Sequence, residues 1–214
     1  MESQSARVRR AFGEASSYVL ELADCVADDQ WDSPAIGDWT LQELFVHTSR
    51  AASTITAYAD TSVERTLMSG AEYYVAVLAD PAIHDAVAQR THSQAAEVDQ
   101  TVPEFLASVF NDAENTLQRI PATAVMGTLG GGITLQDYLP TRVVELVVHG
   151  TDIAEVLAGL GVERIPAPPA TALRVSLEAM VELSTRRPDV LDPVLLLRSV
   201  TGRATLPEGV NLLG

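Results

Sequence analysis

The sequence has no lysine, a single cysteine and no long apolar run, and each of these absences limits what the protein can do. All 14 basic residues are arginines, and they stand against 29 acidic residues, so the formal net charge is −15. A chain this negative repels polyanions, which argues against DNA, RNA or an anionic membrane surface as its partner. We interpret the exclusive use of arginine as the drift of a GC-rich bacterial genome rather than as a sign of function.

The single cysteine, Cys25, cannot form an internal disulfide, and its place in the helical pattern LELADCVADD favours a small buried side chain. The N-terminal stretch MESQSARVRRAFGEASS lacks the apolar run of a signal peptide. No stretch approaches the roughly 18 apolar residues that a membrane span needs. Because 47% of the residues are apolar and can form a normal core, we expect a soluble, cytoplasmic protein.

Helical periodicity dominates the rest of the chain. Apolar residues at spacings of three and four predict four long helices, at 5–28, 40–60, 102–120 and 135–158. The second of these opens with TLQE, in which Thr40 and Glu43 can form a capping box, and TLQD at 134–137 repeats the pattern before the fourth.

Between these helices the sequence predicts less regular structure. The Pro- and Gly-containing stretch at 31–40 indicates a loop, and 70–100 predicts ragged helix that Pro81 breaks. Three glycines between short apolar runs at 121–135 predict a tight loop or a small hairpin.

The C-terminal part is shorter. IPAPPATA at 165–172 indicates a stiff linker, a helix follows at about 169–186, and PVLLLRSVTGRATLP at 193–207 predicts a short strand, a turn and a tail. We therefore predict an all-α protein: a four-helix bundle at 1–162, then a linker and a small helix-plus-strand extension at 163–214.

The fourth predicted helix, RVVELVVHGTDIAEVLAGL, carries a stripe of ionisable residues. Arg142, Glu145, His149 and Asp152 recur every three or four positions, so they share one face, while Val, Leu and Ile cover most of the remaining circumference. A surface helix shows the reverse, a broad polar face and a narrower apolar one. We expect this helix to be enclosed, with its stripe directed into a cavity or the interior.

Buried charges need compensation, because an unpaired ion in the interior costs several kcal/mol. The stripe allows two solutions. Arg142 can pair with Glu145, and His149 with Asp152, as internal salt bridges. Alternatively, Glu145 and His149 can share a metal cation, since Glu-x-x-x-His places an oxygen and a nitrogen ligand on one helical face.

A third candidate ligand lies in the helix at 40–60. His47 falls on the apolar side of that helix, between Leu44 and Ala51. A lone histidine on such a face is more often a hydrogen-bonded core residue. If the two helices face each other, however, His47 joins Glu145 and His149 as three protein ligands with an open position, the pattern of a catalytic zinc site. Asp152 would then orient a ligand imidazole, and Arg142 would bind an anionic substrate.

Two segments resemble a known family. WDSPAIGDWTLQELFVHTSRA and TRVVELVVHGTDIAEVLAG are similar to the metal-binding domain of the mycothiol-dependent maleylpyruvate isomerase family, in the DinB/YfiT-like superfamily of four-helix bundles. The most specific parts are the patterns W-T-x-x-[DE]-L-x-x-H and E-x-x-x-H-G-x-D-[IL]-A. The resemblance spans roughly residues 5–162, and it implies a divalent metal, typically zinc, on His47, Glu145 and His149.

The resemblance also implies chemistry with mycothiol, a low-molecular-weight thiol. A zinc ion with an open position lowers the pKa of a bound thiol and holds it as thiolate. That thiolate can attack an electrophilic small-molecule substrate, in isomerisation of an activated cis double bond or in S-transfer. Such a cosubstrate would supply the nucleophile for a protein whose only cysteine is inert. Related bundles often dimerise, so a homodimer is one expected state, although no helix shows an unmistakable second apolar face.

The chain departs from the isomerases at its C-terminal end. They have a larger C-terminal domain that contributes a basic residue to the active site, whereas here only a short extension follows the bundle. LLLRSVTGRATLP resembles the end of that domain, so Arg203, or Arg198, is the candidate for binding a substrate carboxylate, with two surface arginines as the alternative. This departure argues against maleylpyruvate itself as substrate.

Three functions therefore stay open: a thiol-dependent isomerase or S-transferase with a metal, a non-catalytic binder of metal or small ligands, and a bundle that has lost its metal.

Two further histidines, His84 and His92, lie in a polar stretch and are expected to be exposed rather than ligands. Trp39 flanks the first loop, where it either packs on the end of the bundle or walls the metal pocket.

Overall fold

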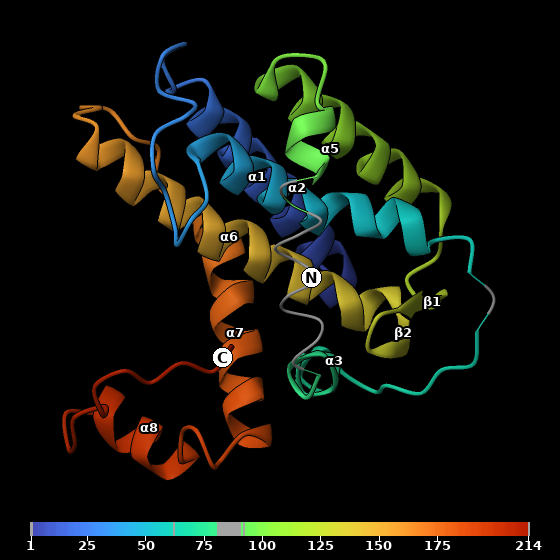
Figure 1. The fold of residues 1–214 in the computed structure, drawn as a ribbon. Helices are drawn as coiled ribbons and strands as arrows, with labels where there is room; N and C mark the ends of the chain where they lie inside the picture. The colour runs from blue at the N-terminus through green and yellow to red at the C-terminus, as the bar shows by residue number, and fades with distance from the viewer. Residues whose placement is uncertain (1, 62, 81–90, 92, 214) are drawn as a thin grey trace.

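The computed structural model describes residues 2–61, 63–80, 91 and 93–213, and within them the chain is helical apart from one small hairpin (Figure 1). Four long helices form a bundle in which neighbours contact in the closed order α1–α6–α2–α5. Their bounds are α1 Gln4–Ala23, α2 Leu41–Tyr58, α5 Val102–Arg119 and α6 Leu135–Gly159. The predicted all-α bundle is confirmed, although α1 ends five residues earlier than its periodicity suggested.

Local hydrogen bonds explain where α2 begins. The Glu43 amide donates to the Thr40 hydroxyl over 3.2 Å, and the Thr40 amide donates to the Glu43 carboxylate over 2.8 Å. This is the capping box that the TLQE sequence predicted. It fixes the register of α2, and with it the face on which His47 lies.

The matching TLQD sequence at the start of α6 behaves differently, so the predicted repetition of the capping box is wrong. The Thr134 hydroxyl donates to the Asp137 carboxylate instead of accepting from the helix backbone. The same carboxylate accepts from Arg65 over 2.8 Å. Aspartate is one methylene shorter than glutamate, and its charge is held here by an arginine from a distant loop rather than by the helix end.

The enclosure of α6 follows from its neighbours. Its apolar residues pack against α1, α2 and α7, and the fully buried ones include Val143, Leu146 and Ile153. Close packing on α1 depends on Gly150, because a Cβ at this position would lie 2.5 Å from the ring of Tyr18. The Tyr18 hydroxyl in turn donates to the Gly150 carbonyl oxygen over 3.1 Å. The expectation of an enclosed helix with a polar stripe is confirmed.

The glycine-rich segment forms a hairpin of β1 (Val125–Thr128) and β2 (Gly131–Thr134), in antiparallel register with Thr128 opposite Gly131. A loop crosses β2, and the Thr66 and Leu67 amides donate to the Gly132 carbonyl oxygen. A Cβ on Gly132 would lie 1.9 Å from a backbone oxygen of that loop, which explains why glycine stands here. The predicted hairpin is confirmed.

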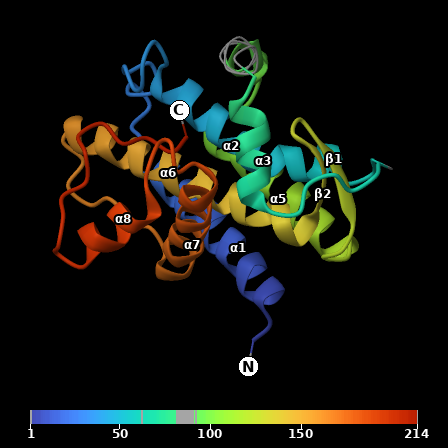
Figure 2. The same ribbon diagram turned by 90° about the horizontal axis from the view of Figure 1, so that it is seen from below.

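Shorter helices lie outside the bundle, among them α3 (Gly70–Leu78), α7 (Ala170–Arg186) and α8 (Pro193–Val200). α7 crosses α6 at a steep angle and contacts α1, α3 and α6, as Figures 1 and 2 show from two directions. Its buried residues join the same core as the bundle helices. The boundary predicted at residue 162 stays a prediction.

The strand predicted within 193–207 is wrong, because residues 193–200 form α8. The Asp192 carboxylate accepts from the Val194 amide over 2.7 Å, and Pro193 occupies the first turn, which together start a helix. A short apolar run such as VLLL fits either element by its pattern alone. A lone strand here would have left its backbone groups unpaired, whereas the helix satisfies them internally.

None of the helices in the described part of the chain combines the length and apolar character that a membrane span requires. After α8 the tail returns to the end of α7, where Arg187 donates to the Leu212 carbonyl oxygen over 2.7 Å. Cys25 is half-buried after α1, and its thiol lies 3.2 Å from the Glu21 carbonyl oxygen.

Candidate metal centre and its cavity

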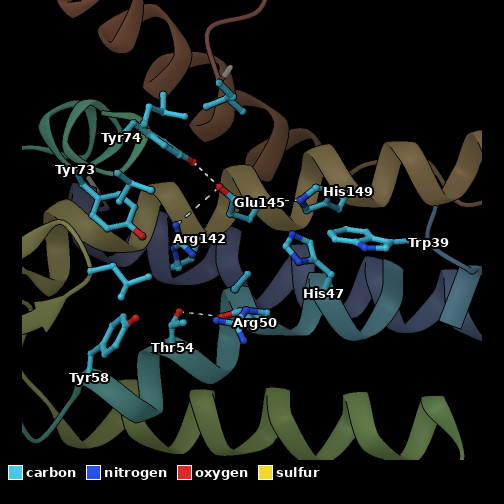
Figure 3. Close-up of a pocket in the computed structure, with 15 residues that line it drawn as sticks. Trp39, His47, Arg50, Thr54, Tyr58, Tyr73, Tyr74, Arg142, Glu145 and His149 are labelled. Atoms are coloured by element: carbon cyan, nitrogen blue, oxygen red, sulfur yellow. Dashed lines mark hydrogen bonds and ion pairs between the residues drawn. The ribbon is translucent and has the colours of Figure 1, made fainter. Parts of the chain in front are cut away.

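A cavity of about 400 Å³ lies beside the polar stripe of α6. It is walled by α2, α3 and α6, with the tip of the hairpin and the C-terminal tail at its edge (Figure 3). Its lining residues are Trp39, His47, Arg50, Ala51, Thr54, Tyr58, Tyr73, Tyr74, Val77, Leu78, Leu129, Arg142, Glu145, His149 and Leu213. The three predicted metal ligands therefore line the same cavity, His47 from α2 and Glu145 and His149 from α6.

His149 is held between two carboxylates of its own helix. Its Nδ1 lies 3.1 Å from Asp152 Oδ2, and its Nε2 lies 3.5 Å from Glu145 Oε2. Asp152 thus fixes the orientation of the ring and accepts the Nδ1 proton, which leaves Nε2 directed toward Glu145. An imidazole anchored in this way at one nitrogen is the usual arrangement of a metal-binding histidine.

His47 approaches from α2. Its ring centroid lies 4.8 Å from that of His149, and the two planes are nearly perpendicular. His47 Nδ1 lies 3.2 Å from the Thr91 hydroxyl, which leaves Nε2 for another partner. Trp39 also packs against the His47 ring, with 4.5 Å between ring centroids. Trp39 therefore walls the pocket, the second of its two predicted roles.

The second oxygen of Glu145 faces away from His149. Oε1 lies 3.1 Å from the Tyr74 hydroxyl, a donor from α3, and 3.9 Å from Nη2 of Arg142. The two oxygens of the Glu145 carboxylate therefore have different partners. Oε1 accepts from Tyr74 and lies near Arg142, whereas Oε2 is directed at His149. Both salt bridges anticipated from the stripe, Arg142 with Glu145 and His149 with Asp152, are present.

Arg142 is buried, with 7% of its surface exposed, and its guanidinium stacks on aromatic rings. The guanidinium carbon lies 4.7 Å from the ring centroid of Tyr138 and 5.4 Å from that of Tyr73. Nε donates to the Thr141 hydroxyl over 3.0 Å. The Nη atoms, in contrast, donate no hydrogen bond to any residue that the structure describes, and the side chain lines the cavity.

Burial and neighbouring charges shift the pKa values of all three predicted ligands. Burial alone would lower the pKa of His149, but its hydrogen bonds to Asp152 and Glu145 outweigh burial and raise that pKa to about 9. Burial would likewise raise the pKa of Glu145, but His149 and Arg142 lower it to about 2. The pKa of His47 falls to about 3, through burial and the nearby positive charge of His149.

These donors suit a divalent transition metal by their chemistry. One carboxylate oxygen and two imidazole nitrogens are ligands that zinc takes in catalytic sites. In the described residues, no group of three His, Cys, Asp or Glu side chains already has the spacing of a metal site. His149 Nε2 and Glu145 Oε2 lie 3.5 Å apart, and the ring of His47 lies beside them.

The remaining predicted residues lie apart from this cavity. Arg203 is exposed in the turn after α8, where its guanidinium donates to the Thr201 carbonyl oxygen, and it does not line the cavity. Arg198 is also exposed and bonds the Arg203 carbonyl oxygen. His84 and His92 lie outside the described residues. The tail reaches the cavity through Leu213, a contribution that no sequence pattern indicates.

Sequence reasoning also missed Tyr74, Arg50 and Tyr58 as lining residues. Tyr74 comes from α3, a helix outside the bundle, and its hydroxyl meets a side chain 71 positions away. Arg50 is three residues after His47, so the spacing along α2 could have indicated it.

The family model of the mycothiol maleylpyruvate isomerase N-terminal domain matches residues 12–154. The chain belongs to this family. The matched segment runs from α1 to near the end of α6, and it contains His47, Glu145, His149 and Asp152. By its description the family is mycothiol-related, and the helical bundle of this chain agrees with the fold that the resemblance implies. No curated protein and no solved structure shows significant similarity to the chain.

Proposed function

We propose that this protein is a divalent-metal-dependent enzyme that activates a low-molecular-weight thiol, with mycothiol as the cosubstrate and zinc as the metal. His47, Glu145 and His149 would hold the metal. The observation that carries the proposal is the orientation of His149, whose Nδ1 is anchored by Asp152 so that Nε2 meets Glu145 beside His47.

The bound metal would supply a lowered thiol pKa, so that the thiol is present as thiolate at neutral pH. Cys25 does not line the cavity, so the sulfur must come with a cosubstrate. Arg142 is positioned to bind an oxygen of an electrophilic substrate, because its Nη donors reach the same cavity as the predicted ligands. The aromatic walls around Trp39 and Tyr73 would exclude water from the reacting groups. We propose isomerisation or S-transfer as the reaction.

A metal-free bundle is the alternative that a specific observation favours. The three ion pairs of the stripe already compensate the charges of Glu145 and His149 without a cation. A non-catalytic metal or ligand binder would use the same cavity without turnover.

Elemental analysis of protein purified without chelator tests the metal. We expect stoichiometric divalent metal in the wild-type protein and its loss in His47→Ala and Glu145→Ala. Glu155→Ala serves as the matched control, because Glu155 is an exposed glutamate on α6 away from the cavity. Equal metal content in all four proteins would show that the assigned ligands are wrong.

A thiol-transfer assay with a panel of electrophiles, with and without mycothiol, then separates an enzyme from a binder. We expect turnover that requires both mycothiol and metal, and turnover lost in His47→Ala. Metal-bound protein whose turnover no added thiol accelerates would leave only the binding function.

A further inference from the structure

We infer that Tyr74 is a positioning residue for the candidate metal centre: it holds Glu145 so that only Oε2 is offered to the metal. The inference rests on the proposed function, because it assumes that Glu145 is a ligand. It concerns a residue of α3, which lies outside the four-helix bundle. The predicted ligands are on two bundle helices, α2 and α6.

The contacts of the Tyr74 hydroxyl carry the inference. This oxygen lies 3.1 Å from Glu145 Oε1 (Figure 3). It also lies 3.1 Å from the Thr141 carbonyl oxygen, so its single proton is shared between two acceptors. Tyr74 is only 5% exposed, so water does not compete freely for these bonds. A hydrogen bond to an ionised carboxylate is stronger than one between neutral groups, so the charge of Glu145 strengthens its share of this proton even at 3.1 Å.

The two oxygens of Glu145 consequently have different surroundings. Oε1 is directed at Tyr74 and, more distantly, at Arg142, whereas Oε2 is directed at His149 Nε2. The hydrogen bond at Oε1 uses one of its lone pairs and fixes the plane of the carboxylate, so Oε2 is the oxygen presented beside His149. Without the phenol, the Glu145 carboxylate can rotate about the Cγ–Cδ bond. It can then bind the metal through both oxygens or turn toward Arg142.

The position of α3 makes this contact rigid. α3 packs on α6 and α7 and starts with a Ser69 cap, and Gly70 lies so close to α6 that a Cβ there would meet Thr141 at 2.8 Å. Tyr74 is one turn further along α3, on the side that faces α6. The accessory helix α3 thus supplies a hydrogen bond to Glu145, a predicted metal ligand on a bundle helix. Hydrogen bonds of this kind orient metal ligands.

Tyr73 provides a matched control. It is the next residue on α3, lines the same cavity and is equally buried, but its hydroxyl makes no hydrogen bond to Glu145 in the described structure. Tyr73→Phe therefore removes a phenol oxygen from the same cavity without touching the carboxylate.

Competition with a chelator measures the metal affinity of the full-length chain. We expect Tyr74→Phe to weaken zinc binding by about 10–100-fold, and Tyr73→Phe to change it by less than about 3-fold. With Co²⁺ in place of zinc, Tyr74→Phe should also alter the visible absorption bands, because a change from one to two carboxylate oxygens changes the coordination. Circular dichroism checks that both variants are folded.

A double-mutant cycle with Glu145→Gln separates positioning from general destabilisation. If Tyr74 acts through the Glu145 carboxylate, Tyr74→Phe will have no further effect on metal affinity in the Glu145→Gln background. An undiminished effect there, or a Tyr74→Phe variant that binds zinc and Co²⁺ like the wild type, overturns this inference alone. Absence of metal binding by the wild-type chain overturns the proposed function itself.

Discussion

His149 and Glu145 are opposite charges in a largely water-shielded position. The side chain of His149 is 20% exposed and that of Glu145 26%. Burial favours their neutral forms, yet Asp152, Arg142 and the pair itself keep both ionised. Because a metal-bound imidazole nitrogen carries no proton, metal binding at His149 should release one.

The metal-free protein should show this pair in its pH dependence. The folded pKa of His149, about 9, lies above the unfolded value of about 6.5, so its stabilising effect is complete below pH ~6.5 and disappears as the pH rises toward 9. Chemical denaturation in the presence of chelator should show that His149→Gln lowers the free energy of unfolding most at pH 6 and least at pH 9.

His47→Gln is the opposite control, because the pKa of His47 falls to about 3 in the folded protein. The unfolded state binds the proton more readily, so the wild type loses stability relative to this variant as the pH falls below ~6.5. If both variants followed the wild-type pH profile in parallel, the charges assigned to the two histidines would be wrong.

Which site residues could be predicted depends on how far their partners lie along the chain. Glu145, His149 and Asp152 follow from helical spacing on one segment. His47 needed the added assumption that two apolar helices face each other, and the cavity bears out that assumption. The role of Tyr74 could not be predicted from the sequence, because no local pattern indicates a contact between an accessory helix and a bundle residue 71 positions away.

At the scale of single elements, the packing of α6 on α1 depends on one close contact between a ring and the helix backbone. Gly150 lets the ring of Tyr18 lie directly against the helix backbone, at the residue that follows His149. The cost of a glycine inside a helix, about 1 kcal/mol relative to alanine, is offset by this packing.

Two glycine replacements on α6 should therefore have opposite effects. Gly150→Ala adds a methyl group where the Tyr18 ring stands 2.5 Å away, and we expect a loss of about 1–3 kcal/mol in the free energy of unfolding. Gly159→Ala meets no atom within 4 Å, so it should gain about 0.5–1 kcal/mol from helix propensity. Urea denaturation measures both, and a stabilised Gly150→Ala variant would contradict the packing described here.

The start of each helix explains where the sequence patterns succeeded and failed. TLQE predicted the cap of α2 because glutamate at the third position reaches back to the backbone, whereas Asp137 in TLQD is engaged by Arg65. The apolar run VLLL suggested a strand within residues 193–207. Asp192 and Pro193, which favour the start of a helix, are the residues that decide the structure there.

At the scale of the whole molecule, α7 is the element that ties the C-terminal part to the bundle. Ala172, Val175 and Leu183 are buried in the same core as α1 and α6. Their removal would expose apolar surface on two bundle helices, so the segment matched by the family model leaves part of its core to be covered by residues beyond it.

A chain truncated after residue 162 should therefore unfold with reduced cooperativity. We expect it to bind a hydrophobic dye and to lose the sharp denaturation transition of the full chain, because about 25 cal/mol are lost for each Å² of apolar surface left exposed. The triple variant Val194→Ser, Leu197→Ser and Val200→Ser is the control, since these α8 residues are exposed. A cooperative transition and no dye binding in the truncated chain would establish residues 1–162 as an independent domain.

The placement of the tail has a practical consequence for anyone who produces this protein. Leu213 lines the cavity and Arg187 fastens the neighbouring carbonyl, whereas the N-terminal residues emerge at a separate place on the molecule (Figure 2). A polyhistidine tag fused after the last residue would begin beside the candidate centre and bring additional imidazoles within reach of its metal. Purification handles and fluorescent labels therefore belong at the N-terminus, where they leave the metal measurements uncompromised.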